Sequence, residues 1–182
     1  MLKIAELCDG LPVSAESTAT TAEGMIEEGK RLAALAPNIV VKLPVCEAGL
    51  AACRALADAG VRVNMTLVFS PTQALMAANA GARYISPFVG RFDDIAEDGI
   101  SQLDNVVTCI KNYDWTGKNV DDTVEIITAS VRTPNHVTQA ALLGADIATV
   151  PMAALKKCLH HPLTDQGLAS FEADWKKVVE AQ

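Results

Sequence analysis

Residues 38–69 read NIVVKLPVCEAGLAACRALADAGVRVNMTLVF. Two apolar runs rich in β-branched residues, 38–45 and 61–69, flank a segment rich in alanine and leucine, and this composition is typical of two strands around a helix. Gly60 follows the helical segment, where glycine commonly ends a helix in the left-handed conformation. The stretch therefore predicts a βα unit, because parallel strands need a helical crossover between them.

The same alternation continues in both directions from this stretch. Further strand-like runs begin near residues 12, 83, 123 and 147, and the expected helices are residues 21–36, 47–59, 71–80, 99–112, 134–143, 152–159 and 164–181. No low-complexity linker marks a boundary, so we predict a single α/β domain over residues 1–182. If its strands form a βα barrel, this length falls below the roughly 200 residues at the lower end for eight units.

The charge balance argues against a nucleic-acid partner. The chain has 22 acidic and 15 basic residues, for a formal net charge of −7 at pH 7. A protein with this balance offers no overall attraction to a phosphate backbone. Half of the residues are apolar, which is enough for a sizeable core and is unlike a disordered chain.

Cysteine spacing and hydropathy bear on the compartment. The five cysteines include no CxxC pair and no His pairing at metal-ligand spacing, so we expect reduced thiols, no metal and a cytoplasmic location. The N-terminal residues carry acids where an export signal needs an apolar run. The uncharged run 63–82 has the length of a membrane span, but Ser70-Pro71 interrupts it. We interpret it as a strand, a turn and a helix, and expect no membrane partner.

One lysine, Lys42, interrupts the first apolar strand of the stretch 38–69. Strands of parallel sheets are commonly covered on both faces, so Lys42 is expected to point into an interior of low dielectric constant. Burial disfavours the ammonium and leaves the neutral amine, which attacks a carbonyl to form a Schiff base. The alternative is a lysine at a strand end whose head group reaches solvent.

Other predicted strands also finish with polar side chains, and the carboxyl ends of barrel strands are where barrel enzymes hold their active sites. These additional candidates are Glu16, Thr66, Ser86, Arg91, Ser130 and Arg132.

The residue types suggest two different roles for these candidates. Glu16 and Thr66 are suited to positioning a water for proton transfer. Arg91, Ser130 and Arg132 are suited to clamping an anion, since a planar guanidinium matches phosphate geometry. The alternatives are a structural ion pair between Glu16 and Lys42, and ordinary surface salt bridges for the arginines.

The C-terminal segment predicts an amphipathic helix. Leu168, Phe171, Trp175 and Val178 recur at steps of three and four residues, which forms an apolar stripe that something must cover. The helix either packs on its own barrel or contacts a neighbouring subunit. The polar stretch 113–122, YDWTGKNVDD, is expected to be a surface loop.

Several of these motifs, in this order, resemble one known family. The chain is similar to the small transaldolases, a group that includes the fructose-6-phosphate aldolases. The resemblance rests on ATTAEGMIEEG, NIVVKLPV, the run from EAGLAACRALADAG to YISPFVGR, ITASVRTP, GADIATVP and HPLTDQGLASFEADW.

The resemblance implies a TIM-type (β/α) barrel that needs no metal or cofactor and moves a dihydroxyacetone unit between sugar phosphates in the pentose phosphate pathway. Lys42 matches the Schiff-base lysine, and Glu16 and Thr66 match the residues that handle the catalytic water. The positions that match the family's substrate and phosphate site are Ser86, Phe88, Arg91, Ser130 and Arg132.

Two of these identities distinguish activities within the family. A glutamate at the position of Glu16 and a phenylalanine at that of Phe88 look like transaldolases, whereas the aldolases typically have glutamine and tyrosine. There are two alternatives to transaldolase activity. One is aldol cleavage that releases dihydroxyacetone, and the other is an inactive barrel that serves only as a binding or interaction module. The family's small members are often rings of subunits, which implies a homo-oligomer formed through the C-terminal helix.

The resemblance also implies a shortened barrel. The family begins with two βα units that carry an Asp in an LDTA-like motif and an Asn in a TTNP-like motif. Neither motif occurs in the 182 residues, and MLKIAELCDG resembles the tail of the second helix. We therefore expect a barrel truncated at the N-terminus to about six parallel strands, with surrounding helices and a C-terminal helix.

Overall fold

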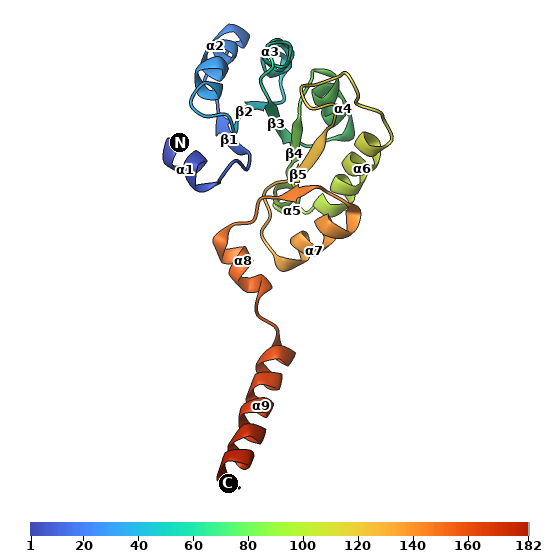
Figure 1. Ribbon diagram of the computed structural model, residues 1–182. Coiled ribbons are helices and arrows are strands. Elements are labelled where there is room, and N and C mark those ends of the chain that lie inside the picture. The colour runs from blue at the N-terminus through green and yellow to red at the C-terminus, as the bar shows by residue number, and fades with distance from the viewer. Residues whose placement is uncertain (182) are drawn as a thin grey trace.

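In the computed structural model, which describes residues 1–181, six strands form one sheet in the order in which they occur along the chain (Figure 1). All five neighbouring pairs are parallel. The strands are β1 (Val13–Glu16), β2 (Ile39–Pro44), β3 (Val63–Val68), β4 (Tyr84–Pro87), β5 (Glu125–Thr128) and β6 (Ile147–Ala148). The six predicted strands are confirmed.

Helices alternate with the strands and surround the curved sheet (Figure 1). They are α1 (Leu2–Leu7), α2 (Ala22–Ala33), α3 (Glu47–Asp58), α4 (Pro71–Asn79), α5 (Gly90–Asp93), α6 (Gly99–Lys111), α7 (Pro134–Leu143), α8 (Met152–Cys158) and α9 (Pro162–Glu180). The short α5 was not anticipated, because four residues carry no periodic signal. The other helices are confirmed to within a few residues at their ends.

Local sequence explains where several helices begin and end. The Ser70 hydroxyl accepts a hydrogen bond from the Gln73 amide at the start of α4, and Pro71 occupies the first turn, where a missing N–H costs nothing. This confirms that the uncharged run is a strand, a turn and a helix. At the end of α7, Gly144 adopts φ 80°, a left-handed conformation that a glycine takes without steric cost.

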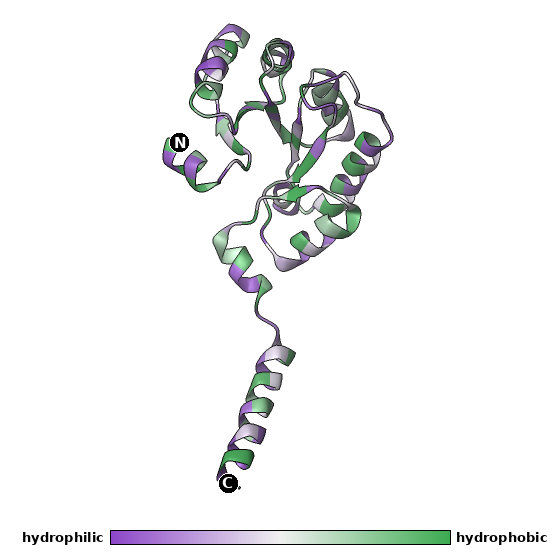
Figure 2. Ribbon diagram, in the orientation of Figure 1, coloured by the Kyte–Doolittle hydropathy of each residue, from purple (hydrophilic) through white to green (hydrophobic). Residues whose placement is uncertain are grey.

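The main core lies between the outer face of the sheet and the helices. Val41, Leu43, Met65 and Ile85 alternate along β2, β3 and β4 and are fully buried. Each such side chain contributes roughly 1.5–3 kcal/mol through its removal from water. Figure 2 shows apolar residues concentrated along the central strands. The period of two along each strand leaves the alternate side chains on the inner face, where the polar residues of the site lie.

The sheet is open, because β1 and β6 are its two edges. The expected architecture of about six parallel strands in a shortened barrel with surrounding helices is therefore confirmed, and the inner face of the sheet is concave (Figure 1). On this face Val40, Tyr84 and Ile127 form a small buried cluster, which lines a cavity of about 380 Å³.

The C-terminal helix does not pack on its own barrel. Helix α9 has no buried residue and extends away from the rest of the chain (Figures 1 and 2). Phe171 and Trp175 are 74% and 66% exposed. The interpretation that its apolar stripe is covered by its own subunit is wrong, because the link after α8 directs the helix away from the sheet. Among the described helices, none combines the length and the hydropathy that crossing a bilayer requires.

The polar loop 113–122 is anchored to the body of the protein. Trp115 is buried, and its indole Nε1 donates a hydrogen bond to the Ile110 carbonyl at 2.9 Å. At the other end of the loop, Arg83 is paired with Asp121 at 3.1 Å and with Glu125 at 2.8 Å. The expected surface loop is therefore held at both ends, although most of its residues are exposed.

Candidate active site

A pocket of about 190 Å³ opens at the carboxyl ends of the strands on the inner face of the sheet. It adjoins the second cavity on this face, of about 380 Å³, with which it shares Ser14, Ile127 and Thr149. The lining residues of the 190 Å³ pocket are Ser14, Lys42, Asn64, Thr66, Ser86, Phe88, Ile127, Ala129, Ser130 and Thr149. Five of the predicted site residues thus meet here, namely Lys42, Thr66, Ser86, Phe88 and Ser130.

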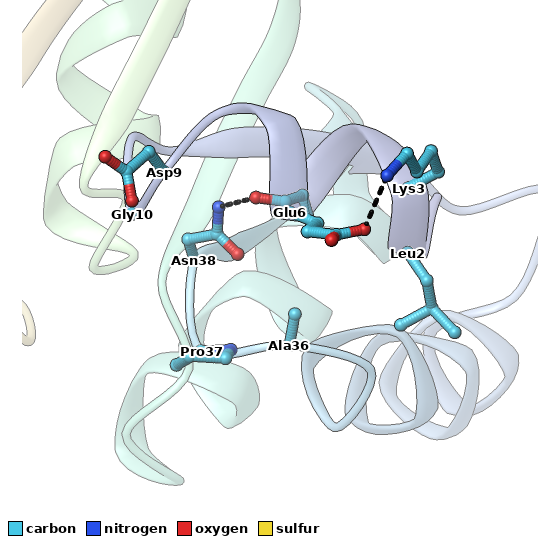
Figure 3. Close-up of a pocket in the computed structure, with 9 residues that line it drawn as sticks. Leu2, Lys3, Glu6, Asp9, Gly10, Ala36, Pro37 and Asn38 are labelled. Atoms are coloured by element: carbon cyan, nitrogen blue, oxygen red, sulfur yellow. Dashed lines mark hydrogen bonds and ion pairs between the residues drawn. The ribbon is translucent and has the colours of Figure 1, made fainter.

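A larger cavity, of about 560 Å³, lies at the opposite ends of the strands beside α1 (Figure 3). Its wall contains the Lys3–Glu6 ion pair, at 3.0 Å, and Asn38, whose amide donates to the carbonyls of Ala5 and Leu11. The asparagine thereby ties α1 to the sheet. Because the amino ends of barrel strands serve stability rather than chemistry, the smaller pocket is the candidate site.

Lys42 and Glu16 form an ion pair beside the pocket. They are direct partners in the parallel register of β1 and β2, and the Lys42 Nζ lies 3.0 Å from a Glu16 carboxylate oxygen. Their side chains are 27% and 56% exposed. The expectation of a dry interior around Lys42 is therefore wrong for this open sheet, because Glu16 lies on the edge strand and admits solvent. Both groups remain in contact across the mouth of the pocket.

Asn64 organises the floor of the pocket and was not anticipated as a site residue. Its side-chain amide donates to the Ser14 hydroxyl at 3.0 Å, and the Ser86 hydroxyl donates to its carbonyl oxygen at 2.7 Å. Asn64 is 3% exposed and is the register partner of Lys42. The period of two that links it to Thr66 in VNMT was the available signal, since both residues face the inner side of β3.

Thr66 presents a buried hydroxyl to the pocket. The residue is 1% exposed, and its Oγ1 has no hydrogen-bond partner among the described residues. A buried hydroxyl without a partner costs free energy, so such a group marks a place for a water or a ligand hydroxyl. The register of β3 against β4 shifts just after Thr66, and Leu67 adopts φ 60°. Irregularities of this kind commonly direct side chains next to active sites.

Ser130 lies in the pocket at the end of β5 in a strained conformation, with φ 59°. Its carbonyl accepts a hydrogen bond from the Gly90 amide at 3.2 Å. A side chain at Gly90 would collide with that carbonyl, and its Cβ would lie 2.7 Å from the Arg132 Nε. The close approach of these two loops therefore requires glycine, and it joins the end of β4 to the end of β5.

The two arginines lie outside the pocket lining. Both Nη atoms of Arg132 donate to the carboxylate of Asp94, with Nη2 to Oδ2 at 2.6 Å. The hydrogen bond from Arg132, together with the charges of Arg132 and Arg91, lowers the pKa of Asp94. Arg91 is exposed on α5 and has no ion-pair partner within residues 1–181. That these arginines clamp an anion with Ser130 stays a prediction.

Aromatic side chains form part of the rim. The ring of Phe69 lies 5.7 Å from those of Phe88 and Phe92, in tilted and edge-on arrangements. Such geometries are favourable for aromatic rings. Phe88, which lines the pocket, therefore packs against Phe69, and Phe69 in turn packs against Phe92 of α5.

Glu28 on α2 fixes the loop that follows Glu16. Its carboxylate accepts hydrogen bonds from the Ser17 hydroxyl at 2.5 Å, from the amides of Thr18 and Ala19 at 2.8 and 3.1 Å, and from the Thr18 hydroxyl. These donors lower the pKa of Glu28 to about 2. The orientation of Glu16 toward Lys42 therefore depends on a carboxylate from the next helix.

No group of three or more His, Cys, Asp or Glu side chains within the described range 1–181 is arranged to hold a metal ion. All five cysteines are free thiols.

Comparison with known proteins gives a consistent result. The chain matches the family described as Transaldolase/Fructose-6-phosphate aldolase over residues 1–182. A probable transaldolase of Thermus thermophilus is 57% identical over 169 residues, which cover 93% of this chain and 73% of that protein. Probable transaldolases of Lysinibacillus sphaericus and Aquifex aeolicus are 54% and 52% identical over 96% and 98% of this chain, and over 77% and 78% of their own lengths.

The role of Glu28 can be tested by its pH dependence. A carboxyl group whose folded pKa is lowered from 4.5 to about 2 stabilises the fold above the unfolded value, and this contribution is lost as the pH falls through that interval. Glu28→Gln should therefore lower the urea midpoint at pH 7 and flatten its decline between pH 4.5 and pH 2. The neighbouring Glu27→Gln, at an exposed position, is the control. Equal pH profiles for both variants would contradict this role.

Proposed function

This chain belongs to the transaldolase/fructose-6-phosphate aldolase family, and on that premise we propose that it transfers a dihydroxyacetone unit between sugar phosphates through a Schiff base on Lys42. The observation that carries the proposal is the position of the Lys42 Nζ, in a polar pocket at the strand ends and 3.0 Å from the carboxylate of Glu16. The free cysteines suit a reducing compartment, and we place the activity in the cytoplasm.

The first chemical step needs a neutral amine. An ammonium cannot attack a carbonyl, so the Lys42 Nζ must lose a proton, and Glu16 is in contact with it. The amine adds to the ketose carbonyl, and the carbonyl oxygen then leaves as water to give an iminium ion. The unpaired hydroxyl of Thr66 is suited to hold that water. Glu16 carries the protons to and from it.

The iminium then accepts electrons from the carbon–carbon bond that breaks. The departing aldose phosphate leaves an enamine on Lys42, which attacks the acceptor aldehyde, and hydrolysis frees the lysine. The hydroxyl next to the breaking bond must lose its proton, and the Asp of the LDTA-like motif that the resemblance assigns to this step has no counterpart in residues 1–182. Borohydride trapping reports the iminium that forms before the carbon–carbon bond breaks, so it does not depend on this proton transfer.

Polar groups around the lysine suit a dihydroxyacetone unit. The network of Ser14, Asn64 and Ser86 presents hydroxyl and amide groups beside Lys42, and these can exchange hydrogen bonds with the sugar hydroxyls. We place the phosphate at the rim, toward Arg91 and Arg132, because a guanidinium matches phosphate geometry.

Borohydride reduction in the presence of fructose 6-phosphate should trap the sugar on Lys42, because the iminium is reduced to a stable secondary amine. Mass spectrometry of the digested protein should find the adduct on the peptide that contains Lys42. Lys42→Arg should abolish the adduct, whereas Lys30→Arg, at an exposed lysine of α2, should leave it unchanged. Absence of an adduct at saturating sugar would disprove the mechanism.

Transfer and simple cleavage can be separated by their dependence on an acceptor. With fructose 6-phosphate as donor, we expect glyceraldehyde 3-phosphate to appear at a sustained rate only when erythrose 4-phosphate is added, because the enamine then reacts with the aldose. A coupled assay measures this product. An equal rate without the acceptor, with release of dihydroxyacetone, would favour the aldolase activity instead.

The exposed stripe of α9 supports a homo-oligomer. An isolated helix of this length is marginal in water, and the 19 residues of α9 include none that is buried. Because the helix points away from its own sheet (Figure 1), the surface that covers its stripe belongs to a second copy of the chain.

Trp175→Glu should shift the protein to a smaller assembly in size-exclusion chromatography with light scattering, because it places a charge in the centre of the stripe. Ala173→Glu adds the same charge on the opposite face of α9 and should leave the mass unchanged. A wild-type protein that is monomeric at high concentration would overturn the oligomer.

A further inference from the structure

The carboxylate of Asp94 accepts hydrogen bonds from both Nη atoms of the Arg132 guanidinium. Nη1 and Nη2 each donate to a different oxygen of Asp94, the second at 2.6 Å. This paired geometry is the one that a guanidinium also adopts with two oxygens of a phosphate. An arginine held in this way cannot offer the same two donors to a bound anion without first releasing the carboxylate.

Arg91 adds a second positive charge to the same patch. It precedes Asp94 by three residues, is exposed, and has no ion-pair partner within the described part of the chain. Its charge contributes to the lowered pKa of Asp94, after the larger effects of Arg132. The carboxylate thus lies in the field of two guanidinium groups, at a rim that the substrate's phosphate would reach from the pocket.

The neighbouring ion pair has a different character. The carboxylate of Asp93 contacts the Nε2 of His136 at 3.0 Å, and the histidine side chain is only 8% exposed. The Nδ1 of His136 accepts a hydrogen bond from the Arg132 amide at 3.3 Å. This contact ties the backbone of Arg132, which precedes α7, to a histidine in the first turn of that helix. The Asp94–Arg132 pair, by contrast, is 46% and 44% exposed, so an anion from solvent can reach both groups.

We propose that Asp94 is an internal competitor for the phosphate of the substrate: it holds the Arg132 guanidinium in the empty site and is displaced when a phosphorylated sugar binds. This inference rests on the proposed function and adds to it a residue that sets the preference for phosphorylated over unphosphorylated sugars. Asp94 acts only through Arg132, so it changes anion affinity and leaves the chemistry at Lys42 unaltered.

Inorganic phosphate binding, measured by isothermal titration calorimetry, tests this directly. Asp94→Asn keeps the shape of the side chain but removes the competing charge, and should tighten phosphate binding by about twofold to fivefold, the factor that an exposed ion pair corresponds to. Glu97→Gln removes one negative charge nearby, from an exposed residue without an ion-pair partner in residues 1–181, and should leave the affinity unchanged.

Trapping kinetics provide the second readout. Asp94→Asn should lower the fructose 6-phosphate concentration that half-saturates borohydride trapping, with no change for dihydroxyacetone, which has no phosphate. A merely structural role for Asp94 would alter both sugars alike.

Several outcomes would overturn the inference. One is a phosphate affinity of Asp94→Asn that is equal to or weaker than that of the wild type. Another is a gain in phosphate affinity in Glu97→Gln as large as that in Asp94→Asn. The third is the absence of phosphate binding in both the wild type and Asp94→Asn. If no sugar is trapped by any variant but Asp94→Asn still binds phosphate more tightly, the proposed function fails and the competition stands. If the wild type traps fructose 6-phosphate but Asp94→Asn shows no gain in affinity, the competition alone fails.

Discussion

The parallel pairing of β1, β2 and β3 is the constraint on which the site depends. It places Glu16, Lys42 and Asn64 side by side at one level of the sheet, although 48 residues separate the first from the last in the chain. Because the side-chain period of a strand is two, a slip of one residue would turn Lys42 under the helices and Leu43 into the pocket. The core under the helices, built on Val41, Leu43 and Met65, therefore also determines which groups face the substrate.

The open edge of the sheet changes the environment of Lys42. In a closed barrel, both neighbours of a strand exclude water, whereas here β1 is an edge, and the Glu16 side chain on it is more than half exposed. Lys42 therefore lies beside a charged neighbour and is only partly buried. Glu28 compensates in part, since it ties down the loop after Glu16 with hydrogen bonds to two amides and two hydroxyls.

The site has two parts that are held by different means. The pocket around Lys42 is built on strands, and its groups are fixed by register and by the buried contacts of Asn64. The rim is built on loops and on α5, where the adjacent carboxylates Asp93 and Asp94 hold His136 and Arg132. Rigid strands suit the chemistry, which requires precise positions. Exposed loop contacts suit the displacement that we propose for Asp94.

The strands, nearly all of the helices, the family and the choice of Lys42 as the candidate Schiff-base residue could all be predicted from the amino-acid sequence. These features are local, since alternating runs, glycine stops and a lysine within an apolar strand can be seen without the fold. Asn64 carries a local signal of the same kind, since it lies two residues from Thr66 on β3 and therefore faces the same pocket.

Contacts between residues far apart in the chain could be seen only in the folded structure. The pairing of Arg132 with Asp94 joins residues 38 positions apart, the exposure of Lys42 follows from the open edge, and α9 is uncovered because of the path that the chain takes after α8. None of these leaves a periodic trace in the sequence, because each depends on the relative placement of elements and not on the composition of any one of them.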